Sequence, residues 1–186
     1  KVAMLEPSDS AECRDFTKMA FELSERFDTP VIVRLSTRVS HSQSLVEEHE
    51  PDTVELKPYE KNVAKNVMMP ANAIRRHVAV EERAERLIEY AETTPLNRIE
   101  DNGAEIGVIC SGISYMYAHE ALGDKVNYLK LGMAYPMPEQ KIRAFAAKCK
   151  KLFVIEELDP FIEEHCRALG VEVTGKSAFT MLGEYT

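Results

Sequence analysis

The chain has 186 residues, of which 45% are hydrophobic and 29% charged, a globular composition that allows one sizeable core or two small ones. The formal net charge of −8 argues against a nucleic-acid partner, because phosphate backbones are bound by clustered Lys and Arg side chains. No apolar run is long enough to cross a bilayer and no signal peptide pattern begins the chain, so we expect a cytoplasmic protein without a membrane partner.

The four cysteines, Cys13, Cys110, Cys149 and Cys166, are far apart, and none belongs to a Cys-x-x-Cys pair. This spacing predicts neither an iron–sulfur cluster nor a structural zinc site, and it identifies no metal ligands. We expect reduced thiols in helices and strands.

Residues 1–35 predict a strand, a helix and a strand. Residues 2–5 are apolar, and Asp9 with Glu12 three residues later resembles a capping box at the start of the helix. The apolar run 31–33 is typical of a strand in a parallel sheet. Such a βαβ unit needs more sheet to pack against, so we expect an exposed apolar sheet edge or face. The helix has one apolar face, made of Cys13, Phe16, Met19, Ala20, Leu23 and Phe27.

Residues 36–69 are rich in Ser, His, Glu, Pro and Lys and have no apolar periodicity, so we expect a long connection between domains. Asn72 is a candidate N-cap of a helix that runs to about Thr93. Arg–Glu pairs along this helix are typical of a solvated helix with one docked stripe.

Residues 105–175 alternate strands with helices, which predicts an α/β fold with a doubly wound, mainly parallel sheet. Pro138 and Pro160 are expected in the first turns of two of these helices, where Pro is tolerated. The four expected strands are residues 106–110, 126–131, 152–155 and 171–173.

Ligands of open parallel sheets bind at the carboxyl ends of the strands, which suggests one crevice formed by residues 110–112, 132–135 and 156–159. Ser111 and Gly112 precede a helix N-terminus that would favour an anion, although a simple turn and cap is the favoured interpretation. Glu156 and Glu157 place carboxyl groups at another strand end. These carboxyl groups could serve acid–base chemistry or form ion pairs at an interface. No nucleophile lies nearby in the sequence, which favours the structural role.

Arg38, Ser40 and His41 follow the strand at residues 31–33. A guanidinium, a hydroxyl and an imidazole at a strand end are able to bind a carboxylate or phosphate. A polar turn between domains that satisfies its own backbone is the favoured alternative.

Several segments of the sequence resemble, in the same order, segments of the α subunit of indolepyruvate:ferredoxin oxidoreductases, a family of thiamine-dependent 2-oxoacid oxidoreductases. The phrases Thr37-Arg-Val-Ser-His-Ser and Glu156-Glu-Leu-Asp-Pro-Phe point to this aryl-pyruvate branch rather than to the pyruvate or oxoglutarate branches. The resemblance runs essentially end to end, through residues 2–10, 30–42, 69–72, 94–100, 130–138 and 154–161.

By this resemblance, residues 1–45 are similar to the C-terminal part of a thiamine pyrimidine-binding domain. Residues 46–99 form a linker and connecting helix, and residues 100–186 are similar to a transketolase C-terminal-like domain. The family oxidatively decarboxylates an aryl pyruvate such as indolepyruvate with CoA, giving an aryl-acetyl-CoA, CO2 and reduced ferredoxin. The implied partners are the rest of the α subunit, a β subunit and ferredoxin, and the implied cofactors are thiamine diphosphate, Mg and 4Fe-4S clusters.

The family's thiamine-activating glutamate, its Gly-Asp-Gly motif and its clustered cysteines have no counterpart in residues 1–186. We therefore expect no catalytic residue in this chain, no cofactor bound by it, and a structural or interface role in a parent enzyme. The alternative is a free-standing α/β module that binds a nucleotide, CoA or another anion through its strand-end loops. A small hydrolase that uses Glu156 or Glu157 ranks last, because it lacks a nucleophile.

Overall fold

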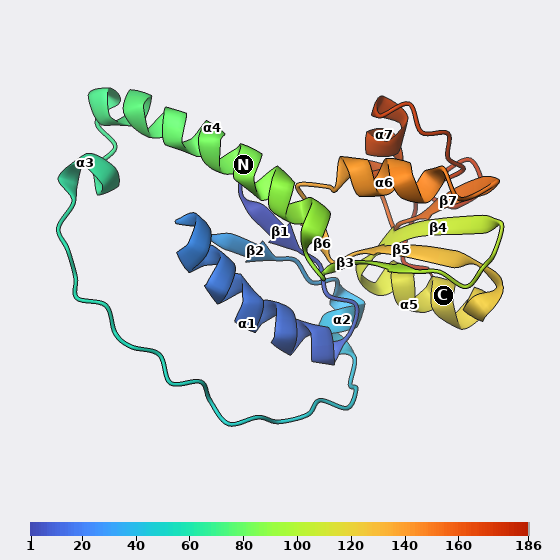
Figure 1. Ribbon diagram of the computed structural model, residues 1–186. Coiled ribbons are helices and arrows are strands. Elements are labelled where there is room, and N and C mark those ends of the chain that lie inside the picture. Colours follow the sequence, from blue (N-terminus) through green and yellow to red (C-terminus); the bar gives the residue numbers. More distant parts are fainter. Residues whose placement is uncertain (186) are drawn as a thin grey trace.

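The computed structural model describes residues 1–185, which form two small sheets joined by a long connection and a long helix (Figure 1). The strands are β1 (Ala3–Leu5), β2 (Val31–Val33), β3 (Asn97–Glu100), β4 (Ile106–Ser111), β5 (Asn127–Leu131), β6 (Met133–Tyr135) and β7 (Lys151–Ile155). The helices are α1 (Ser10–Phe27), α2 (Thr37–His41), α3 (Val63–Asn66), α4 (Pro70–Thr93), α5 (Gly112–Leu122), the 3-10 turn η1 (Gly123–Lys125), α6 (Glu139–Ala146) and α7 (Phe161–Ala168). The predicted α/β fold class is confirmed.

The first sheet has the strand order β2-β1-β6, in which β1 is parallel to β2 and antiparallel to β6. The predicted helix is present as α1, and Asp9 caps it by accepting the backbone N–H of Glu12 at 2.8 Å. In a capping box the Glu12 carboxylate would also accept the backbone N–H of Asp9. It accepts that of Ser8 instead, so this second part of the prediction is wrong. The core between α1, α4 and the sheet includes Ala3, Leu5, Phe16, Leu23, Phe27, Leu87, Ala91 and Met133.

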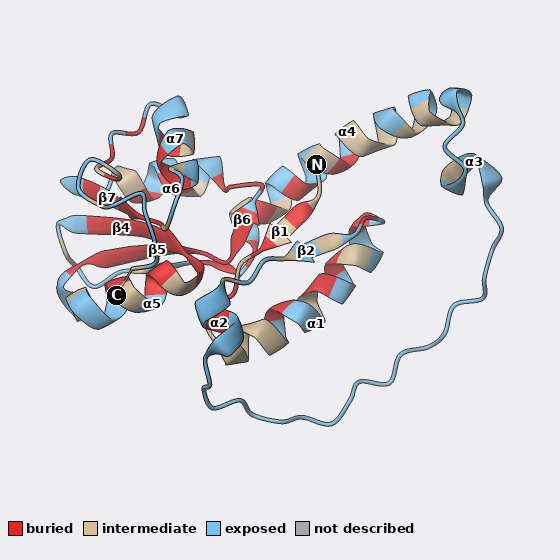
Figure 2. Ribbon diagram, turned by 180° about the vertical axis from the view of Figure 1, so that it is seen from behind, coloured by how far each residue is buried: buried red, intermediate tan, exposed pale blue. Residues whose placement is uncertain are grey.

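The face of the first sheet that points away from α1 is only partly covered. Met4 pairs with Ile32 on one side and with Tyr135 on the other, so the three side chains form a row on this face. Ile32 is 47% exposed and Tyr135 is 39% exposed. In Figure 2, β2 is partly buried to exposed, whereas β5 is buried throughout. The expectation of an exposed apolar sheet face is confirmed.

Residues 43–62 contain no helix or strand, as predicted for the connection. Two short helices at its ends were missed. The Ser36 hydroxyl caps α2 by accepting the N–H of Val39, and the Asn62 side chain caps α3 by accepting the N–H of Lys65. Each helix is too short to show apolar periodicity, so only its polar cap marks it in the sequence.

Helix α4 begins at Pro70 and has no side-chain cap at Met69. The prediction that Asn72 caps this helix is wrong: Asn72 lies in the first turn and donates to the carbonyl of Val67 at 2.9 Å. Pro at the first helical position supplies the start signal instead. The single docked stripe is present and consists of Arg83, Leu87 and Ala91. Within residues 1–185, no helix is both long and apolar enough to cross a membrane.

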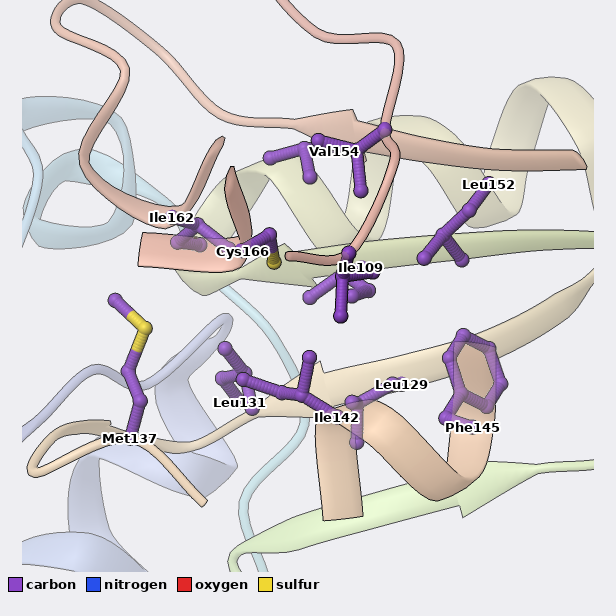
Figure 3. Close-up of a cluster of buried hydrophobic side chains, with 12 residues drawn as sticks. Ile109, Leu129, Leu131, Met137, Ile142, Phe145, Leu152, Val154, Ile162 and Cys166 are labelled. Carbon is purple, nitrogen blue, oxygen red and sulfur yellow. The ribbon is translucent and has the colours of Figure 1, made fainter. Parts of the chain in front are cut away.

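The second sheet has the order β3-β5-β4-β7, with β4 parallel to both β5 and β7 and with β3 antiparallel at the edge. Helices α6 and α7 cover one face, and α5 covers the other, so the predicted doubly wound, mainly parallel sheet is confirmed. Figure 3 shows the core under α6 and α7, which includes Ile109, Leu129, Ile142, Phe145, Val154 and Ile162.

Three parts of this region differ from the predictions. Residues 171–173 are not a strand, because only the bridge between Phe153 and Thr174 joins this segment to β7. Strand β3 was missed because an edge strand keeps polar, exposed residues such as Arg98. Residues 133–135, expected in a ligand loop, form β6 and pair with β1 in the other sheet. Pro138 and Pro160 are the N-caps of α6 and α7, one position before the predicted first turn.

Candidate functional site

The strand-end residues Ser111 and Gly112 lie against the side chain of Glu6. Ser111 ends β4 and Glu6 follows β1, so this contact joins strand ends from both sheets. Ser111 Oγ donates to Glu6 Oε2 at 2.8 Å, and the Arg34 guanidinium donates to Glu6 Oε1. Gly112 has a φ of +50°, and a Cβ there would lie 3.0 Å from Glu6 Cγ. The carboxylate of the chain itself therefore lies beside the helix N-terminus that the sequence marks for an external anion.

The Glu156 side chain caps the N-terminus of α7. Its two carboxylate oxygens accept the backbone N–H groups of Ile162 and Glu163, at 2.8 and 3.0 Å. The side chain is buried, and burial raises its pKa although these two hydrogen bonds oppose the shift. The arrangement satisfies two N–H groups that a helix start leaves free, which is a structural use of the carboxylate.

Glu157 and Arg38 come close to each other through the C-terminal segment. The backbone N–H of Tyr185 donates to Glu157 Oε1 at 2.8 Å, and Arg38 Nη2 lies 2.7 Å from Glu184 Oε2. The hydrogen bond to Glu184 raises the pKa of Arg38. The hydroxyl of Tyr117 is buried here, without a hydrogen-bond partner in residues 1–185. The residues after β2 and after β7 thus meet, but residues 184–185 mediate the contact.

Ser40 and His41 lie apart from these contacts. Ser40 Oγ donates to the carbonyl of Ser36 at 3.0 Å, inside α2. His41 ends α2 and is exposed, and its side chain forms no hydrogen bond within residues 1–185. The Ser40 contact is of the kind expected for a polar turn that satisfies its own backbone.

Lys130, which was not predicted as a site residue, is a fully buried cation in β5. Its Nζ donates to the carboxylate of Glu12 and to Ser8 Oγ, the latter at 2.8 Å. The same Nζ lies 4.8 Å from the ring centroid of Tyr115, within the range of a cation–π interaction. Arg98 Nη1 lies 3.0 Å from Glu12 Oε1 and completes the cluster. A lone lysine within a strand expected to be covered on both faces is the sequence signal that points to such a residue.

Glu12 and Lys130 stabilise each other's charge in this cluster. Burial by itself would raise the pKa of Glu12, but the charge of Lys130 and hydrogen bonds from Lys130 and Ser8 outweigh it and lower the pKa. Burial lowers the pKa of Lys130, and Glu12 opposes this shift. Because α1 carries Glu12 and β5 carries Lys130, the pair ties the two sheets together.

A cleft of about 590 Å³ lies at the amino-terminal end of β7. It is lined by Arg143, Lys150, Lys151 and Glu172, among others. None of the predicted site residues lines it. Four of them lie at the carboxyl ends of β4 and β7, at the opposite end of this sheet, and the other three follow β2 of the first sheet. Within residues 1–185, no group of three or more His, Cys, Asp or Glu side chains is placed to hold a metal ion.

Comparisons with known proteins identify relatives over nearly the whole chain. The indolepyruvate oxidoreductase subunit IorA of Archaeoglobus fulgidus is 37% identical over 185 residues, which cover 95% of this chain and 29% of the relative. The corresponding subunit of Thermococcus kodakarensis is 34% identical over 202 aligned residues, covering 100% of this chain and 31% of the relative. The chain therefore spans about 30% of the length of the curated relatives it matches. No family model matches the chain.

A solved structure of similar fold is the 2-oxoglutarate:ferredoxin oxidoreductase from Magnetococcus marinus, determined with 2-oxoglutarate, coenzyme A and succinyl-CoA bound. It superimposes with a TM-score of 0.60 over 93% of this chain and 38% of that one, at 18% identity, so it supports the fold alone. The subunits from Archaeoglobus and Thermococcus exceed 30% identity over at least 95% of the chain. The chain thus belongs to the family of indolepyruvate oxidoreductase IorA subunits.

Proposed function

We propose that this chain is part of an oxidoreductase that oxidatively decarboxylates aryl pyruvates such as indolepyruvate. The reaction consumes CoA and gives an aryl-acetyl-CoA and CO2, and the electrons pass to ferredoxin. The observation that carries this proposal is the 37% identity to an indolepyruvate oxidoreductase subunit across 95% of the chain. The rest of the α subunit, a β subunit and ferredoxin are the partners that this function requires.

Within that enzyme, we infer a structural and interface role for the chain. Two features support this role. The Glu12–Lys130 pair and the Glu6–Ser111 hydrogen bond hold the two sheets together, and the sheet face at Ile32 and Tyr135 is available to the rest of the subunit. The chain alone is expected to be inactive.

Thiamine diphosphate would supply the decarboxylation chemistry of the parent enzyme, with Mg holding its diphosphate and 4Fe-4S clusters carrying the electrons. The residues of this chain do not fit these groups. Within residues 1–185, no three His, Cys, Asp or Glu side chains are grouped to hold a metal ion. The strand-end carboxylates Glu6 and Glu156 are engaged, Glu6 by Ser111 and Arg34 and Glu156 by the start of α7. No catalytic step is assigned to the residues of this chain.

The test is an assay of the full-length protein that contains this chain, co-purified with its partner subunit. We expect ferredoxin reduction that depends on indolepyruvate and CoA and that is much slower with 2-oxoglutarate. The chain alone serves as the control, and it should show no turnover with added thiamine diphosphate and Mg. Turnover by the full-length complex with 2-oxoglutarate but not with aryl pyruvates would contradict the proposed substrate class. Turnover by the chain alone would contradict its structural role.

A further inference from the structure

Residues 45–60 form an acidic strap that lies outside both sheets. The strap contains six Asp or Glu residues and a single lysine. Figure 1 shows it as the long teal loop that leads from α2 towards α3. It reaches α1 through two ion pairs between exposed side chains, Asp52 with Lys18 and Lys57 with Glu25. Its apolar side chains remain outside any core: Leu45 is 98% exposed, Leu56 92% and Tyr59 86%.

Residues 61–78 form a basic arm that begins where the strap ends. The arm comprises α3 and the first part of α4, and it contains four Lys or Arg residues and no Asp or Glu. Its apolar side chains are also exposed, and Ile74 and Val78, one helical turn apart, form one patch on α4. The other exposed apolar residues of the arm are Val63, Val67, Met68 and Met69.

The charges of the strap and the arm are complementary but are not paired with each other in one copy of the chain. Within residues 1–185, no ion pair joins the strap to the arm. The cations Lys61 and Arg75 have no carboxylate partner there, and neither Glu50 nor Glu55 has a cationic one. Exposed apolar side chains grouped with unpaired charges of one sign are typical of protein interaction surfaces.

We propose that the acidic strap of one copy binds the basic arm of a second copy of this chain, and the reverse, in a two-fold interface. Each copy carries both surfaces, so a two-fold arrangement forms the same contact twice. A second copy is favoured over an unrelated partner because the two complementary surfaces belong to the same chain. The ion pairs of the strap with α1 hold it on the side of α1, and not across its own arm. This interface does not depend on the proposed reaction.

The test uses charge reversal in the full-length protein, at positions that have no ion-pair partner in one copy. The arm variant carries Lys61→Glu and Arg75→Glu. The strap variant carries Glu47→Lys, Glu48→Lys, Glu50→Lys and Glu55→Lys, so that in each variant the sum of the unpaired charges on the changed surface reverses its sign. Each variant alone should self-associate about tenfold more weakly in sedimentation experiments, since both contacts of its dimer become repulsive. A mixture of the two variants should associate as tightly as the unmodified protein, because both contacts become complementary again. Higher salt should weaken the unmodified dimer.

Matched control variants are Lys125→Glu and Glu120→Lys, which change the same charges at exposed positions of η1 and α5. They should leave self-association unchanged. A carbodiimide cross-linker applied to a mixture of isotopically light and heavy chains provides a second measurement that other dimer contacts do not mask. Cross-links between light and heavy chains that join residues 47–60 to Lys61 or Lys65 support the proposal. Cross-links confined to single chains, or no effect of charge reversal on association, would overturn it.

Discussion

Lys130 Nζ lies 2.8 Å from Ser8 Oγ, although the two are 122 positions apart in the chain, Lys130 in β5 of the second sheet and Ser8 in the turn between β1 and α1. The buried ammonium group also pairs with Glu12, so a single side chain in β5 binds the start of α1. Removal of this cation leaves the Glu12 carboxylate in a mostly buried position with only Ser8 and Arg98 as partners. The contact between the two halves of the chain thus includes a buried charge beside the Glu6–Ser111 hydrogen bond and the pairing of β6 with β1.

We expect Lys130→Ala to lower the free energy of unfolding by about 3–5 kcal/mol, because it leaves a buried charge without its partner. Urea denaturation of the chain measures this change. The matched control is Lys125→Ala. Its exposed side chain forms no ion pair within residues 1–185, and its loss should change stability by less than about 0.5 kcal/mol. Equal stability of the two variants would mean that the Lys130 cluster does not hold the sheets together.

The lowered pKa of Glu12 predicts acid sensitivity of the same contact. An acid whose pKa is lower in the folded state stabilises that state at pH values above its unfolded pKa, which for Glu is ordinarily near 4.5, and this contribution is lost as the pH falls through the folded pKa. We therefore expect Glu12→Gln to remove part of the loss of stability below pH 4.5. Denaturation midpoints of both proteins across this pH range provide the measurement. Parallel pH curves for the two proteins would contradict the assignment.

Gly112→Ala should destabilise the chain by about 1–3 kcal/mol, for two reasons. A non-glycine residue at a φ of +50° is strained, and the new Cβ would lie 3.0 Å from Glu6 Cγ. Gly103→Ala is the control, because its φ is +69° and no atom lies within 4 Å of the added Cβ. A larger loss of melting temperature for Gly112→Ala than for Gly103→Ala is expected. If both variants lose the same amount, the contact with Glu6 is not tight.

Glu156→Gln should lower stability by about 1–3 kcal/mol, because an amide NH2 would replace one of the two oxygens that accept the N–H groups of Ile162 and Glu163. Glu157→Gln provides the neighbouring control. Its carboxylate accepts one N–H, from Tyr185, and the amide oxygen of Gln can still do so. We expect circular dichroism melting curves to separate the two variants, and a neutral Glu156→Gln would argue against the capping role.

Cys110 and Cys166 should resist thiol reagents in the folded chain. Both are buried with 0% exposed surface, and burial raises the pKa of each thiol to about 12, so the reactive thiolate is scarce at neutral pH. Cys13 and Cys149 are partly exposed and should react first. Mass spectrometry after timed alkylation, with and without urea, measures the order. Early modification of Cys110 would contradict its burial.

The sequence alone was sufficient to predict the helices and strands that depend only on their own residues and immediate neighbours. Helix α1 follows from its Asp9 cap and its apolar face, and strands β4, β5 and β7 follow from continuous apolar runs between helices. The phrases shared with the indolepyruvate oxidoreductase family were also readable in the sequence, and the comparisons confirm the family. Such features depend on neighbours within a few residues, which a linear pattern records.

Only the tertiary structure decided which groups meet across the chain. The pairing of β6 with β1, the contact of Glu6 with Ser111 and the burial of Lys130 against Glu12 all join residues that are more than 100 positions apart. Each of these residues has an ordinary local pattern, because a charged side chain is compatible with a loop, a helix surface or a buried ion pair. Each of these residues meets its partner only when the two sheets pack against each other. The residues next to it in the sequence therefore do not indicate which partner it will contact.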